Sequence, residues 1–158
     1  MDAVATLKRP PAWYWIVAAG SLLWNVFGAF VFAVMVLMVT GTFDIASEEA
    51  MANLTEAQRA QTVTTKEVIL GTPMWSNIAF AFAVGCGVAG SVALLMRRRI
   101  ATPLFIVSLA GVLVQNAYNY LLSDAVAKIG VGLSPVVILI AIALVPYSMF
   151  CGKKAWLR

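Results

Sequence analysis

Long stretches without a charged side chain constrain this sequence more than any other feature. Uncharged or apolar runs extend from Pro10 to Phe43, Pro73 to Met96, about Pro103 to Leu122, and Pro135 to Phe150. At a rise of roughly 1.5 Å per residue, about 20 residues of helix cross the ~30 Å hydrocarbon layer of a membrane. Of the 158 residues, 62% are hydrophobic and 11% are charged, more apolar surface than a soluble core of this size would hide. We therefore expect lipid to surround most of the chain.

This pattern predicts an all-α integral membrane protein, a single domain built as an up-down-up-down bundle of four transmembrane helices. We expect spans at about residues 11–40, 73–96, 103–122 and 135–150, with a polar loop at residues 44–72. The first run is longer than the ~7–15 apolar residues of a signal peptide, so we expect it to remain as an anchor.

Proline opens each expected span, and in three of them it follows Thr72, Thr102 or Ser134. A Thr or Ser before a proline predicts an N-cap residue followed by proline at the first helical position. Within the polar loop, Ser47 and Asn53 are followed by acidic residues and predict the starts of short helices on the membrane surface.

The basic residues predict the orientation of the helices. Only Arg59, Lys66 and Lys128 fall on the side of the polar loop, and all other basic residues fall on the opposite side: Lys8, Arg9, Arg97, Arg98, Arg99, Lys153, Lys154 and Arg158. The positive-inside rule then places both termini in the cytoplasm. The net charge of +4 indicates orientation and not nucleic-acid binding. The same side chains predict binding of anionic lipid head groups, chiefly by Arg97, Arg98, Arg99, Lys153 and Lys154. Topology alone also explains them, and the two interpretations are compatible.

Several kinds of chemistry are disfavoured by the residues that the sequence lacks. It contains no histidine, and no Asp, Glu, Lys or Arg falls in the middle of an expected span. Ion-coupled transport normally requires ionisable groups within the membrane. No nucleophile–base pair or cluster of metal ligands is visible either. We expect a protein that is not an enzyme and that holds no metal or cofactor.

Five side-chain amides and one phenol are expected near the membrane centre or in the half on the side of the polar loop. An amide is costly there unless it is hydrogen-bonded. The cluster comprises Asn25, Asn77, Gln115, Asn116, Asn119 and Tyr120. Three interpretations remain open. The amides could bond to one another between helices, line a pocket for an uncharged polar molecule, or face another membrane subunit.

Small residues gather in the second span. The segment from Gly85 to Gly90 matches the G-x-G-x-x-G pattern of dinucleotide-binding folds, but that motif requires a preceding strand, and here it lies inside an apolar helix. Small side chains also let helices approach closely in lipid. Gly85, Gly87, Gly90 and Ser91 therefore predict either a packing centre of the bundle or a face for self-association.

The chain resembles a family of short, four-span bacterial inner-membrane proteins that are labelled as sugar transporters. The resemblance lies in Trp13-Tyr14-Trp15 with Leu23–Gly28, in Glu56–Arg59, and in Pro103-Leu104-Phe105 leading to Leu122-Ser123-Asp124. It implies a bacterial inner membrane. Our leading hypothesis is an accessory or interaction subunit of a membrane assembly, with membrane lipids and a membrane-protein partner or a second copy as its contacts. The alternative is a passive facilitator or binding protein for a neutral polar solute such as a sugar.

Overall fold

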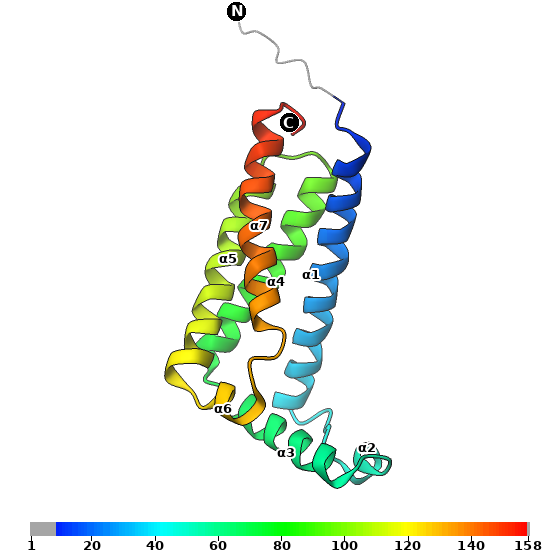
Figure 1. Ribbon diagram of the computed structural model, residues 1–158, viewed down its shortest axis with the longest axis vertical. Helices are drawn as coiled ribbons and strands as arrows, with labels where there is room; N and C mark the ends of the chain where they lie inside the picture. Colours follow the sequence, from blue (N-terminus) through cyan, green and yellow to red (C-terminus); the bar gives the residue numbers. More distant parts are fainter. Residues whose placement is uncertain (1–8, 158) are drawn as a thin grey trace, which may run out of the picture.

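The computed structural model describes residues 9–157, and every element in that range is a helix (Figure 1). Four helical segments are long and apolar enough to cross a membrane. They are α1 (Ala12–Val39), α4 (Met74–Leu95), α5 (Ala101–Ala117) continued by the π-helix η1 (Tyr118–Leu122), and α7 (Ser134–Lys153). The predicted four-helix membrane bundle is confirmed.

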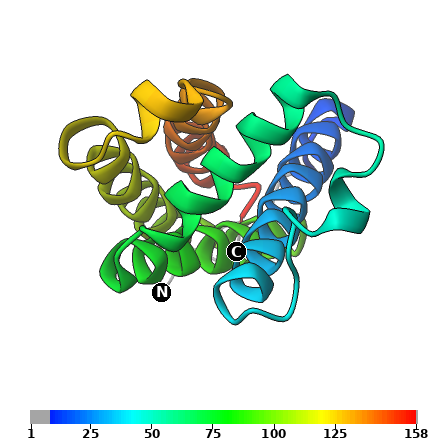
Figure 2. The same cartoon turned by 90° about the horizontal axis from the view of Figure 1, so that it is seen from below.

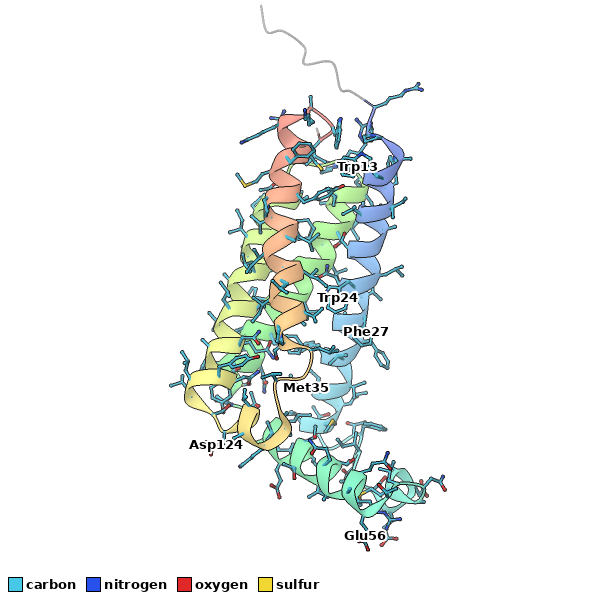
Figure 3. All side chains as sticks on the ribbon, viewed as in Figure 1. Trp13, Trp24, Phe27, Met35, Glu56 and Asp124 are labelled. Carbon is cyan, nitrogen blue, oxygen red and sulfur yellow. The ribbon has the colours of Figure 1, made fainter. Side chains whose placement is uncertain are left out.

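Successive long helices run in opposite directions, so the start of α1 and the end of α7 lie together (Figure 1). Helix α4 packs most extensively against α5, and it also contacts α1, while α7 packs on α5. We call the end that carries Arg97–Arg99, Lys153 and Lys154 the basic end, and the opposite end the α3 end. Figure 3 places Trp13 at the basic end and Glu56 with Asp124 at the α3 end.

Three short helices cover the α3 end. They are α2 (Glu48–Met51), α3 (Glu56–Leu70) and α6 (Ala125–Ile129). Helix α3 contacts both α1 and α6, and it crosses beneath the bundle (Figure 2). The polar loop thus forms a lid across one end of the four long helices.

The helix starts in this loop follow local capping chemistry. Ser47 caps α2 as predicted, because its Oγ accepts a hydrogen bond from the Ala50 N–H at 3.3 Å. The prediction that Asn53 caps the next helix is wrong. Thr55 is the cap, and its Oγ1 accepts from the Gln58 N–H at 3.3 Å while Gln58 Oε1 accepts from the Thr55 N–H at 3.0 Å. This reciprocal capping box satisfies two backbone donors, which moves the start of α3 two residues along the chain.

The predicted Thr and Ser caps of the long helices are also wrong. Thr72 precedes the cap of α4, which is Pro73, and its hydroxyl donates to the Val68 carbonyl at 2.9 Å. Thr102 lies inside the first turn of α5, and Ser134 is the first residue of α7. The N–H groups of a first turn have no acceptor within the helix, so proline is tolerated throughout that turn. The prolines therefore predicted the region where each long helix begins, but not which residue is the N-cap.

One ion pair ties the lid to the end of α1. Lys66 Nζ on α3 donates to Asp44 Oδ2 at 2.6 Å, and Asp44 Oδ1 accepts from the Ala46 N–H at 2.8 Å. The hydrogen bond from Lys66, with the backbone N–H of Ala46, holds the pKa of the Asp44 carboxyl below its ordinary value of 3.8.

The best-packed core lies at the basic end. After α7 the chain turns back at Ala155, where φ is 55°, and buries Trp156 and Leu157 between the helix ends. Arg97 Nε donates to the Trp156 carbonyl at 2.8 Å. The Trp156 ring lies 5.4 Å from that of Trp13, edge to face. Hydrophobic burial and ring contacts therefore close this end of the bundle.

Candidate functional site

The predicted amide cluster is spread over different environments. Asn25 on α1 is half-buried, and its Nδ2 donates to the Ser21 carbonyl at 2.8 Å and to Ser91 Oγ at 3.1 Å. Asn116 is buried, and its Nδ2 donates within α5 to the Val112 carbonyl at 2.8 Å. The other members lie nearer the α3 end than Asn25 does. Tyr120 is exposed, and the half-buried residues are Asn77, Gln115 and Asn119. Only Asn25 makes the interhelical hydrogen bond that one interpretation expected.

Two buried polar atoms accept or donate no hydrogen bond among residues 9–157: Ser76 Oγ and Asn116 Oδ1. They belong to α4 and α5 where these helices approach the α3 end, and the rings of Trp75 and Tyr118 meet there edge to face at 5.3 Å. Helix α5 changes to a π-helix at Tyr118, immediately after this point. An unpaired buried polar atom carries a desolvation cost, so this is a poorly satisfied part of the α4–α5 interface.

The small residues of α4 divide between two faces. A methyl group added at Gly87 would lie 2.0 Å from Asn25 Oδ1, and one added at Gly90 would lie 3.0 Å from the Phe105 ring. Together with buried Ser91, these residues pack against α1 and α5. Gly85 differs, because a methyl group there would meet nothing within 4 Å. Gly87, Gly90 and Ser91 therefore lie in the packed interior between helices, while Gly85 faces away from the bundle.

Gly111 on α5 is a packing residue that the sequence interpretation missed. A methyl group there would lie 2.6 Å from the Ala79 carbonyl oxygen and 2.9 Å from the Ala83 backbone nitrogen. Ser108, one turn earlier, donates to the Ala83 carbonyl at 2.6 Å. The three-residue spacing of two small side chains in an apolar helix is the signal that could have found this contact.

The outward face of α4 carries an exposed stripe in heptad spacing. Its members, alternately four and three residues apart, are Ile78, Phe82, Gly85, Ala89, Val92 and Met96. At about 100° per residue they fall within roughly an 80° arc. Large side chains occupy its ends, and the small pair Gly85 and Ala89 occupies its centre, which gives α4 a shallow outward-facing notch. We call these six residues the α4 stripe.

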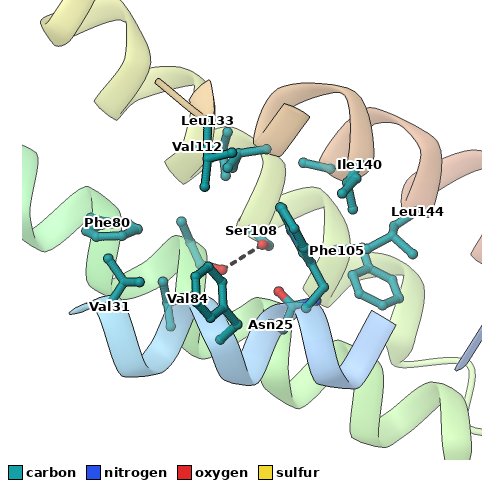
Figure 4. A pocket seen from close by; sticks show the side chains of 16 residues that line it. Asn25, Val31, Phe80, Val84, Phe105, Ser108, Val112, Leu133, Ile140 and Leu144 are labelled. Atoms are coloured by element: carbon teal, nitrogen blue, oxygen red, sulfur yellow. Dashed lines mark hydrogen bonds between the residues drawn. The ribbon is translucent and has the colours of Figure 1, made fainter. Parts of the chain in front are cut away.

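A cavity of about 180 Å³ lies inside the bundle, bordered by α1, α4, α5 and α7 (Figure 4). Its lining is almost entirely apolar, and it includes Phe27, Val31, Phe80, Val112, Val137 and Ile140. Asn25, Ser108 and the indole of Trp24 supply the polar side-chain groups, and no ionisable group lines it. Asn77, Gln115 and Asn119 are not part of the lining, so the predicted polar pocket does not coincide with this cavity.

At the basic end, the predicted head-group residues have distinct surroundings. Arg97 Nε and Arg99 Nε donate to the carbonyls of Trp156 and Leu157, at 2.8 and 3.5 Å. Arg98, Lys153 and Lys154 are exposed, and Lys154 Nζ lies 5.5 Å from the Phe150 ring centroid. Of the other basic residues expected on this side, Lys8 and Arg158 lie outside the described residues.

Fold and surfaces together define a class: a multi-pass membrane protein with a four-helix bundle, a helical lid across one end and a largely apolar cavity between the long helices. No family model, curated protein or solved structure matches the chain. Inferences about function therefore depend on the surfaces described above.

Proposed function

We propose that the protein is a non-enzymatic accessory subunit of a membrane assembly, and that it contacts a transmembrane helix of its partner, or of a second copy, through the α4 stripe. The observation that carries this proposal is the exposed small pair Gly85 and Ala89, which lies between large exposed side chains on the outward face of α4. A glycine and an alanine four residues apart let a neighbouring helix approach closely, where the contact is stabilised by van der Waals packing.

The arrangement of large and small side chains supports a helix as the occupant. Phe82 is 59% exposed on one side of the notch, and Val92 and Met96 are exposed on the other. In lipid the hydrophobic effect does not drive helices together, so shape must supply the preference for protein over lipid. A notch flanked by large side chains provides such a shape.

The alternative, a facilitator for a neutral polar solute, has less support. A sugar requires several hydrogen-bonding groups along its path, whereas the cavity offers the side chains of Asn25 and Ser108 and the indole N–H of Trp24 in an otherwise apolar lining. The remaining amides lie elsewhere along α4 and α5.

The membrane setting is part of the proposal. We place the protein in a bacterial inner membrane with the basic end, and hence both termini, in the cytoplasm, because the basic residues gather there. Exposed Arg98, Lys153 and Lys154 would contact anionic lipid head groups on that side.

A matched pair of variants tests the α4 stripe. Gly85→Leu fills the notch, and Gly20→Leu adds the same bulk to α1 at a glycine that also has nothing within 4 Å. The protein is extracted with its native lipids, and the mass of the intact complex is measured by native mass spectrometry. We expect the wild type and Gly20→Leu to retain a stoichiometric partner or second copy, and Gly85→Leu to lose it.

Two outcomes would contradict the proposal. A wild-type protein that is monomeric and alone in native-lipid particles would have no partner to contact. A complex that survives Gly85→Leu would show that association uses another face.

A further inference from the structure

The cavity is suited in size and lining to an apolar body about as large as an aromatic ring. Its volume is about 180 Å³, and an apolar cavity of roughly 150 Å³ in another protein stays dry and binds benzene. A transmembrane helix is about 10 Å across and would not fit. The occupant must therefore be a small hydrophobic molecule or one segment of a larger lipid-soluble one.

The route into the cavity lies between α1 and α7. These helices meet near the basic end, where the Tyr147 hydroxyl donates to the Tyr14 carbonyl at 3.5 Å and its ring lies 5.9 Å from that of Trp13. Nearer the α3 end, Val31 of α1 and Val137 of α7 line the cavity instead. This seam is closed by aromatic rings at one end, and α1 and α7 are both long and apolar enough to cross a membrane, so we expect a ligand to enter from the lipid.

Asn25 and Ser108 line the cavity, and their side-chain oxygens lie together beside Gly87, which is not itself part of the lining; we call these two oxygens the polar floor. A methyl group added at Gly87 would lie 2.0 Å from Asn25 Oδ1 and 3.1 Å from Ser108 Oγ, so both oxygens border the same point above Gly87. Asn25 comes from α1, Ser108 from α5 and Gly87 from α4. A glycine at the meeting point leaves room for these two polar side chains to come together.

Both of these polar groups use their donors on the protein. Asn25 Nδ2 donates to the Ser21 carbonyl and to Ser91 Oγ, and the carbonyl partner identifies this atom as the nitrogen of the amide. The Ser108 hydroxyl donates its single hydrogen to the Ala83 carbonyl. Asn25 Oδ1 and the lone pairs of Ser108 Oγ remain as acceptors. The floor of the cavity thus accepts hydrogen bonds but offers none.

From these observations we infer that the cavity is a binding site for a lipid-soluble alcohol or phenol, with its hydrocarbon body among the apolar side chains and its hydroxyl donating to Asn25 Oδ1 or Ser108 Oγ. A ketone or an ester has no hydrogen to donate to these two oxygens, so neither can make this bond. This inference is independent of the α4 stripe, because the two sites lie on different faces of α4.

A matched pair of ligands tests it. Binding of 4-fluorophenol and of fluorobenzene to the full-length protein in lipid nanodiscs is measured by ¹⁹F NMR, with empty nanodiscs correcting for partition into lipid. One additional hydrogen bond in an apolar site is worth on the order of a tenfold change in affinity. We expect 4-fluorophenol to bind about tenfold more tightly than fluorobenzene. The double variant Asn25→Leu with Ser108→Ala removes both acceptors and should reduce that ratio to less than about threefold.

Variants that fill the cavity locate the site. Ala141→Phe adds a ring to the α7 wall, and Ala143→Phe adds the same ring to an exposed position of that helix. Gly28→Leu fills from the α1 wall, where an added methyl group would meet only Val84 at 3.9 Å. If Ala141→Phe does not fold, Gly28→Leu provides the same test. Both filling variants should abolish binding of either ligand, whereas Ala143→Phe should leave it unchanged.

Equal affinity of the wild type for the two ligands would overturn the hydroxyl preference. Binding that persists in a folded filling variant would overturn the location of the site.

Discussion

The Tyr14 hydroxyl on α1 donates a buried hydrogen bond to the Leu94 carbonyl on α4, joining residues 80 positions apart in the sequence. Both side chains are fully buried, and they belong to the core that closes the basic end. The bond ties the first turn of α1 to the last turn of α4. Because α1 has few other buried residues, its attachment to the bundle depends strongly on this end.

Removing that hydroxyl should therefore loosen α1. Tyr14→Phe retains the ring and its packing but leaves the Leu94 carbonyl with only the Arg97 N–H as a donor, at 2.9 Å. We expect the free energy of unfolding to fall by about 1 kcal/mol. Reversible unfolding in mixed micelles measures it, with Tyr120→Phe, at an exposed ring, as the control. Equal stabilities of the two variants would contradict the prediction.

Two glycines of the long helices, Gly111 and Gly85, should respond differently to the same change. Gly111→Ala brings a methyl group against the Ala79 carbonyl and the Ala83 nitrogen, which are backbone atoms and cannot rotate away. We expect it to lower the free energy of unfolding by about 1–3 kcal/mol by forcing α4 and α5 apart. Gly85→Ala meets open space and should be neutral or slightly stabilising. The same unfolding measurement would contradict the assignment if Gly85→Ala proved the more harmful variant.

Two buried serines on α4 should also differ. Ser76 Oγ has no hydrogen-bond partner among the described residues, so Ser76→Ala removes an unsatisfied atom and should leave stability unchanged or raise it by up to about 1 kcal/mol. Ser91 Oγ donates to the Gly87 carbonyl at 2.9 Å and accepts from Asn25. Ser91→Ala removes the interhelical acceptor of Asn25 Nδ2 and leaves it only the Ser21 carbonyl, so it should lower stability by about 1 kcal/mol. A larger loss in Ser76→Ala than in Ser91→Ala would show that the Ser76 hydroxyl has a partner.

Low pH should release the lid from the end of α1. The lowered pKa of Asp44 means that its pairing with Lys66 is fully present above pH 3.8, the ordinary value for this carboxyl, and is lost as pH falls through the lower folded value. A ¹³C NMR titration of the Asp44 carboxyl should give a midpoint below 3.8 in the wild type. In Lys66→Gln the midpoint should move back toward the ordinary value. A midpoint that Lys66→Gln does not change would contradict the ion pair in solution.

The proposed orientation can be tested by labelling single cysteines in intact cells. Both native cysteines are unpaired, so Cys86→Ala and Cys151→Ala provide a cysteine-free background without breaking a disulfide. A membrane-impermeant thiol reagent should label Glu56→Cys from outside and leave Lys154→Cys unlabelled until the cells are opened. The reverse pattern would place the basic end outside.

Features that depend on residues close together in the chain were accessible from the sequence. Four long apolar runs indicate four spanning helices because a backbone in lipid must satisfy its own hydrogen bonds, and a helix does so within one segment. Ser47 was identified as a cap for the same reason, since its partner is three residues away. The error at Asn53 arose because Thr55 offers a competing cap with a reciprocal partner in Gln58.

Features that depend on how each helix is rotated about its axis required the tertiary structure. Composition cannot separate Gly85, which faces outward, from Gly87 and Gly111, which allow close approach to neighbouring helices. Nor could the depth of the amides show that Asn25 reaches Ser91 and the cavity while Gln115 and Asn119 do not line it. Apolar helices present no strongly polar face to set their rotation, so packing between side chains of different helices determines it. That packing alone creates the seam between α1 and α7 and the two acceptors at its floor.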